Sequence, residues 1–175
     1  MQYCAFLRGV NVKGTNMKMK KVCSVFENAG MQKVQSVLAS GNIIFDSDIK
    51  ATDVKILLEK AMSQAFDYDA NLFLSDKTQL TAIIQNNPFE INKENHIYVF
   101  LGVKNIEKIL LDSFNKENAI QGENAAISKG YFYWQIPKGG TLGSPFSKVL
   151  GRKDMKDKFT SRNINTVEKV LHKMN

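Results

Sequence analysis

Residues 33–45, with the sequence KVQSVLASGNIIF, hold two apolar segments separated by a tight turn. Residues 33–39 indicate one strand, and residues 43–45 begin the next. The Ser-Gly-Asn sequence at 40–42 is typical of a turn. This segment therefore predicts two consecutive strands, and the remaining elements can be placed around it.

The flanking residues extend this pair of strands into a longer pattern. A strand at 2–7 is followed by a helix that Gly30 ends, and after residue 45 come an amphipathic helix and a fourth strand. The order βαββαβ results. The second half repeats it loosely, from a linking helix that Asp76 and Gln79 can cap. Its further expected elements are a strand at 97–101, a helix at 106–114, a hairpin of 125–128 with 131–136, and a last helix at 167–174.

This order of elements predicts an α+β fold of two ferredoxin-like units, each a βαββαβ or α/β plait with an antiparallel sheet. We expect the first plait at residues 1–75 and the second, with the C-terminal helix, at 76–175. No Pro-rich or low-complexity linker separates the halves, so we expect the two units to pack together.

Composition narrows the class of protein. The formal net charge is +7, from 24 basic and 17 acidic residues, which weakly favours phosphate-bearing partners. Cys4 and Cys23 stand apart from each other and from any histidine at metal-ligand spacing, so we expect free thiols in a reducing cytoplasm and no metal. No signal peptide or membrane-spanning run is apparent, and no cofactor motif is present. The oligomeric state stays open.

Three short polar clusters contain the unusual residues: 8–11, 40–42 and 160–163. They are rich in donors and anion partners, and they contain no His, Cys, Asp or Glu for proton transfer. In a βαββαβ unit the first two strands run in the same direction, so residues 8–16 should lie near residues 40–42. We expect a small anionic ligand there, bound by Arg8, Asn11, Ser40 and Asn42. Arg162 and Asn163 are further candidate ligand residues, and their placement relative to Arg8 stays open.

A structural interpretation of the same clusters stays open. Gly and Asn are ordinary turn residues, and Arg8 could be a surface ion-pair partner. Thr160, Ser161 and Asn163 are plausible N-caps of the last helix. Capping does not account for Arg162, because a cation in the first helical turn opposes the helix dipole and calls for an anionic partner.

Two other classes of function remain as alternatives. Residues 129–134, KGYFYW, share their first three positions with an RNA-recognition motif, so nucleic-acid binding is possible but not favoured. Alternation places Tyr131 and Tyr133 on one face of the strand and Phe132 and Trp134 on the other. One pair should be core, and the other could be exposed or buried between the two units, which we expect. An enzyme acting on a phosphorylated or carboxylated molecule would need a base from outside the clusters, with Lys18 or His96 as candidates.

Five stretches of sequence, in order along the chain, form a recognisable set: Arg8-Gly9-Val10-Asn11-Val12 with Gly14 and Met19; Ser40-Gly41-Asn42-Ile43-Ile44-Phe45; Asn87-Pro88-Phe89; Tyr133 with Pro137 and Gly139; and Arg162-Asn163 with Thr166-Val167. On these residues the chain resembles, nearly from end to end, a bacterial family known as domain of unknown function family 1697. The chain departs from the usual family pattern at Lys13, Ala39 and Ile164. The resemblance implies two ferredoxin-like plaits and no particular activity.

Overall fold

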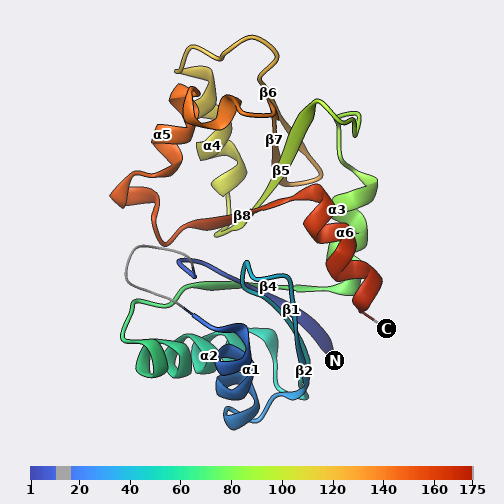
Figure 1. The fold of residues 1–175 in the computed structure, drawn as a ribbon, viewed down its shortest axis with the longest axis vertical. Coiled ribbons are helices and arrows are strands. Elements are labelled where there is room, and N and C mark those ends of the chain that lie inside the picture. The colour runs from blue at the N-terminus through green and yellow to red at the C-terminus, as the bar shows by residue number, and fades with distance from the viewer. Residues whose placement is uncertain (11–16, 175) are drawn as a thin grey trace. The chain divides into compact units, whose positions relative to one another are not determined.

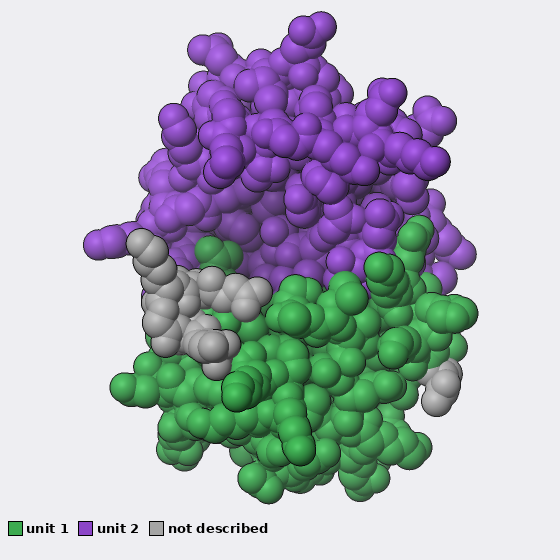
Figure 2. Space-filling model, in the orientation of Figure 1, with its two compact units in different colours: residues 1–80, 168–175 green, residues 81–167 purple. Residues whose placement is uncertain are grey.

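The computed structural model describes residues 1–10 and 17–174. They form two compact units: residues 1–80 with 168–175 make unit 1, and residues 81–167 make unit 2 (Figure 2). The sequence placed the boundary near residue 75 and the whole last helix in the second half. In the structure the C-terminal residues group with unit 1 instead.

Unit 1 contains a four-stranded antiparallel sheet in the order β2-β3-β1-β4. Its strands are apolar at most inward positions, and two helices lie on one face of the sheet (Figure 1). Phe26 of the first helix meets Phe45 of the sheet edge-on, with ring centroids 5.5 Å apart. The elements in chain order are β1 (Gln2–Leu7), α1 (Met19–Asn28), β2 (Gln32–Val37), β3 (Asn42–Asp46), α2 (Ala51–Phe66) and β4 (Leu72–Asp76).

Unit 2 contains a second four-stranded antiparallel sheet, in the order β6-β7-β5-β8. Its central aromatic side chains pack with those of the helices into one core. The elements are β5 (Asn95–Gly102), α4 (Ile106–Asn115), β6 (Asn124–Ser128), β7 (Tyr131–Pro137), α5 (Pro145–Leu150) and β8 (Phe159–Asn163), with short 3-10 helices at Gly140–Leu142 and Lys153–Met155.

Two helices connect the units covalently. α3 (Lys77–Gln85) follows β4, and α6 (Ile164–Lys173) follows β8. The predicted cap of α3 is confirmed: the backbone N–H of Gln79 donates to Oδ1 of Asp76 at 2.8 Å, and Oε1 of Gln79 accepts from the N–H of Asp76 at 3.0 Å. This reciprocal pair satisfies two donors at the start of the helix.

The structure corrects the sequence analysis over residues 139–163. From the sequence we assigned no helix or strand between the hairpin that ends at residue 136 and the helix-capping candidates at 160–163, whereas the structure has helix α5 and strand β8. Ser144 caps α5, since its hydroxyl accepts from the N–H of Ser147, and Pro145 stands at the first helical position. Phe146 of α5 then completes the aromatic core, 5.5 Å from the ring of Trp134. The α+β class with two antiparallel sheets is thus confirmed.

Candidate functional site

The connection after β1 and the β2–β3 turn lie side by side, as the sequence predicted. The backbone N–H of Leu7 donates to the carbonyl oxygen of Gly41 at 2.8 Å. Gly41 has φ +75°, and a Cβ on it would lie 2.5 Å from Cγ2 of the buried Val10. Glycine is required here because the backbone is left-handed and the neighbouring segment is in contact. Two of the three polar clusters therefore meet at one end of the unit 1 sheet.

Arg8 stands at this end of the sheet, just after β1 leaves it. Its backbone N–H donates to the carbonyl of Asn71 at 2.9 Å, which ties it to the residue before β4. The Arg8 side chain is half-buried. Asn11, the other residue predicted from this cluster, lies outside the described residues. The structure therefore places one guanidinium-bearing residue next to the turn.

Asn42 has a structural role that explains its place in the cluster. The residue is fully buried, and its Nδ2 donates to the carbonyl of Val37 at 2.8 Å and to Oγ of Ser40 at 3.0 Å. The amide therefore closes the β2–β3 turn from within. Ser40 is exposed on the same turn, so Asn42 fixes its position.

Arg162 and Asn163 lie on β8 in unit 2, opposite Val99 and Tyr98 of β5. The prediction that Arg162 occupies the first turn of a helix was wrong, and with it the argument from the helix dipole. Arg162 is 8% exposed, and its Nη1 donates at 2.8 Å to Oγ1 of Thr160 and to the carbonyl of Ser161. Its own strand thus supplies part of its hydrogen bonding.

Asn163 does act at the start of a helix. Its Oδ1 accepts from the backbone N–H of Asn165 at 3.0 Å, and α6 begins at the next residue, Ile164. Its Nδ2 lies 3.3 Å from Nδ1 of His96. The structure therefore brings Arg8, Ser40 and Asn42 together in unit 1, and Arg162 with Asn163 in unit 2.

The aromatic strand β7 is largely internal. Phe132 and Trp134 belong to the core of unit 2, and Tyr133 is also fully buried. The Tyr133 hydroxyl donates to the carbonyl of Ile83 at 2.8 Å, and burial raises its pKa. Tyr131 is half-buried. Burial of Tyr133 agrees with the prediction, and it removes one of the two rings that base stacking would need.

Among residues 1–10 and 17–174, no three His, Cys, Asp or Glu side chains gather in a way that could hold a metal ion. Cys4 and Cys23 are free thiols, and burial raises the pKa of Cys23. None of the helices in the described part of the chain combines the length and the apolar composition that crossing a bilayer requires.

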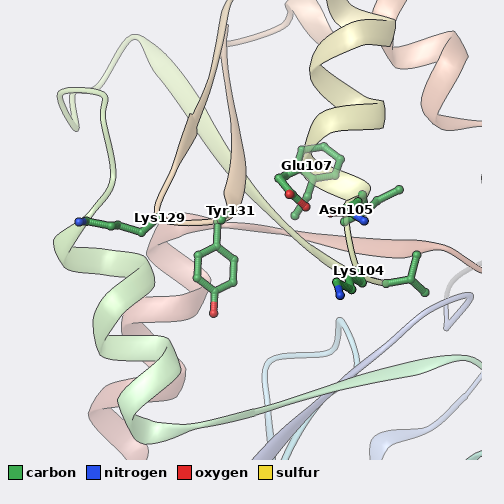
Figure 3. A pocket seen from close by; sticks show the side chains of 10 residues that line it. Lys104, Asn105, Glu107, Lys129 and Tyr131 are labelled. Carbon is green, nitrogen blue, oxygen red and sulfur yellow. The ribbon is translucent and has the colours of Figure 1, made fainter.

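Unit 2 has a pocket of about 360 Å³ at the end of its own sheet. One wall comes from the β5–α4 connection and the first turn of α4, with Lys104, Asn105 and Glu107, and the other from the β6–β7 turn, with Lys129 and Tyr131 (Figure 3). These two segments correspond in chain order to the connection after β1 and the β2–β3 turn of unit 1. Sequence reasoning missed the pocket because we applied the argument about strand direction to the first half alone.

Comparison with known proteins agrees with this architecture. The model of a family described as protein of unknown function (DUF1697) matches residues 1–133. The chain belongs to this family. It is also similar to a solved structure, a conserved bacterial protein from Streptococcus pneumoniae, with 20% sequence identity and a TM-score of 0.77 over 98% of this chain and 97% of that one. That likeness concerns the fold alone. Among curated proteins, none matches the chain.

Proposed function

We propose that this DUF1697 protein is a cytoplasmic protein that binds a small anion or a phosphate-bearing ligand at the end of the unit 1 sheet. The main support for this proposal is the hydrogen bond of 2.8 Å from the backbone N–H of Leu7 to the carbonyl oxygen of Gly41. It brings the connection that begins with Arg8 against the turn that contains Ser40. A guanidinium stays charged at all ordinary pH values, and its planar fork matches carboxylate and phosphate oxygens.

Each residue has a separate role in the proposed site. Arg8 pairs with the charge of the ligand, and the exposed Ser40 orients it. Asn42 acts indirectly by holding Ser40, because a fully buried amide cannot reach a surface ligand. Asn11 belongs to the proposal from its sequence position alone. Arg162 and Asn163 form a separate candidate contact on β8, which substitution of Arg162 would test by itself.

We also propose that both units are ferredoxin-like plaits. Each follows the order βαββαβ, and the strand orders β2-β3-β1-β4 and β6-β7-β5-β8 correspond position by position. In such a unit the connection after the first strand and the turn after the second emerge together, which supports a site at that end.

The two alternatives have less support. Nucleic-acid binding through Tyr131 and Tyr133 needs exposed rings, and Tyr133 is buried. Catalysis needs a base near the ligand. Lys18 is exposed just before α1, and His96 lies beside Asn163 and Tyr98 in unit 2. Within residues 1–10 and 17–174, no hydrogen bond joins the side chain of Lys18 or His96 to a Ser, Thr or Cys side chain that could act as a nucleophile, so binding is the better-supported function.

The test is a thermal-shift screen with inorganic phosphate, nucleotides, sugar phosphates, carboxylates and short single-stranded RNA, at two salt concentrations. A ligand that binds only the folded state raises the melting temperature by mass action. Arg8→Ala should abolish the shift with little loss of intrinsic stability. Arg152→Ala is the matched control, because it also removes one guanidinium but from an exposed ion pair with Asp154.

Each outcome decides between the functions. A shift with one small anion that persists at high salt and disappears in Arg8→Ala supports the proposal. A shift only with RNA, lost as salt rises, favours the nucleic-acid alternative, since counterion release drives such binding. The proposal fails if every probe leaves the wild-type melting temperature unchanged, or if Arg8→Ala lowers it by many degrees without any ligand effect.

A further inference from the structure

We propose that the pocket of unit 2 binds a small zwitterion, a molecule that joins an ammonium and a carboxylate to an apolar body. The lining residues of the pocket all belong to unit 2 and include none of Arg8, Ser40 and Asn42. The proposal rests on the cavity, its apolar floor and two opposite charges at its edge.

The cavity has the size and floor of a small-molecule site. Its volume of about 360 Å³ falls within the range of roughly 300–1,000 Å³ found for ligand pockets. Phe100 and Ile106 are buried beneath it, at 2% and 4% exposure, and Val103 adds an apolar edge that is 46% exposed. A ligand with an apolar body can therefore remove apolar surface from water here.

Lys104 and Glu107 provide the opposite charges. They stand three positions apart where β5 leads into α4, yet within residues 1–10 and 17–174 neither forms an ion pair with the other or with any third residue. Elsewhere in the chain such charges do pair, as in Lys33 with Asp46. A zwitterionic ligand would satisfy both at once, with its ammonium on Glu107 and its carboxylate on Lys104.

The directions of the side chains distinguish Glu107 from Lys129, two charged residues that both line the pocket. Figure 3 shows Glu107 reaching from the first turn of α4 toward the hairpin that carries Tyr131. The ring of Tyr131 forms part of the wall on that side, where an aromatic face favours a nearby ammonium. Lys129 also lines the pocket, but its amine is directed away from Lys104 and Asn105 (Figure 3). The charge-matched control is therefore taken from outside the pocket, at the exposed Lys138 after β7.

The experiment is a titration of the 15N-labelled full chain, followed by NMR, with L-leucine, N-acetyl-L-leucine, L-leucinamide and the dipeptide leucyl-glycine. L-leucine should shift the amide resonances of Gly102, Asn105 and Gly130, which line the pocket. The acetylated and amidated forms, which each lack one charge, should bind about tenfold or more weakly, since a hydrogen bond to a charged group is lost. Equal binding of the dipeptide means that the site also takes short zwitterionic peptides, and weaker binding identifies a free amino acid as the ligand.

Variants assign the two charges. Glu107→Gln should weaken L-leucine binding about tenfold to a hundredfold, and Lys104→Ala should do the same. Lys138→Ala should bind as the wild type does, although it also removes one positive charge, because Lys138 is exposed after β7 and does not line the pocket. Arg8→Ala should retain L-leucine binding, which separates this site from the proposed anion site. The proposal is overturned if no probe shifts these resonances at millimolar concentration, if the singly charged analogues bind as well as L-leucine, or if Lys138→Ala weakens binding as much as Lys104→Ala.

Discussion

The indole Nε1–H of Trp134 donates a hydrogen bond of 2.8 Å to Oε1 of the buried Glu123. The same oxygen accepts from Oγ of Ser144 at 2.6 Å, and Oε2 accepts from the backbone N–H of Ile120 at 2.9 Å. Since Ser144 also caps α5, one carboxylate connects the central strand β7, the start of β6 and the start of a helix. Buried polar groups of this kind are tolerated when every hydrogen bond is made.

Glu123→Ala should destabilise unit 2 strongly, because it leaves buried donors on Trp134 and Ser144 without an acceptor. Each unsatisfied buried group costs about 1–3 kcal/mol. Urea unfolding followed by fluorescence measures this directly, since Trp134 is the single tryptophan of the chain. Glu90→Ala, at an exposed position, is the control. Equal midpoints for the two variants would argue against a structural role of the buried carboxylate.

Tyr133→Phe should also lower the stability of unit 2, by about 1–3 kcal/mol, since the carbonyl of Ile83 loses its 2.8 Å partner. The ring and its packing are retained, so the variant isolates the hydroxyl. The free energy of unfolding can be obtained from urea titration with far-UV circular dichroism. A loss below about 0.5 kcal/mol would mean that water replaces the hydroxyl at this carbonyl.

Asn42→Ala should lower the stability of unit 1 by about 1–3 kcal/mol, because the carbonyl of Val37 would lose a buried donor. Ser40→Ala removes an acceptor of the Asn42 amide at an exposed position and should cost much less. Thermal unfolding of the two variants gives the comparison. If Ser40→Ala proved the more damaging, the turn would depend on the serine and not on the buried amide.

Gly41→Ala and Gly30→Ala separate backbone strain from steric contact. Both glycines have positive φ, +75° and +91°, so alanine at either costs about 1–2 kcal/mol. Only at Gly41 would the new Cβ meet another side chain, 2.5 Å from Cγ2 of Val10, whereas nothing lies within 4 Å at Gly30. Calorimetry should therefore find Gly41→Ala less stable by a further ~1–3 kcal/mol. Similar melting temperatures would indicate that the connection after β1 moves aside easily.

The ion pair of Lys33 and Asp46 predicts a small acid dependence of stability. The Lys33 ammonium lies 2.9 Å from the carboxylate and lowers the pKa of Asp46. A group with a lowered pKa in the folded state stabilises above its unfolded pKa and loses that contribution as pH falls through the folded value, here below about pH 4. Lys33→Ala should reduce this slope at low salt, and carboxyl NMR titration should find the Asp46 pKa moved back toward its ordinary value, because the Gln2 hydrogen bond and the N-terminal charge remain. A pKa unchanged by the substitution would rule out Lys33 as the cause.

The sequence predicted the elements whose physical signals are local. The bounds of β1, Gln2–Leu7, agree fully because alternation and apolar content coincide there. The cap of α3 was also predictable, since the Asp76 and Gln79 pattern specifies its own hydrogen bonds. Helix α5 was missed because six residues give too little periodicity, and only Phe146 and Val149 are buried on it. β8 was missed because its buried positions include the polar Thr160 and Arg162.

The candidate sites also contain features that the sequence could predict and features that depend on packing. Strand direction predicted that the segments of Arg8 and Ser40 would meet, because this depends on chain order alone. It did not predict that the amide of Asn42 would be buried and hydrogen-bonded within its own turn, because the burial of an amide depends on how the strands pack. Lys104 and Glu107 look in the sequence like an ordinary charged start of a helix, and only the cavity beside them distinguishes them.

The division of the chain into units has a consequence for synthesis on the ribosome. Residues 168–175 belong to unit 1, whereas unit 2 is made from the continuous stretch 81–167. Translation proceeds from the N-terminus, so every residue of unit 2 is made before the last segment of unit 1 exists. The first sheet to be synthesised therefore belongs to the last unit to be finished, and a chain that ends at residue 167 would contain every residue of unit 2 but lack the last segment of unit 1.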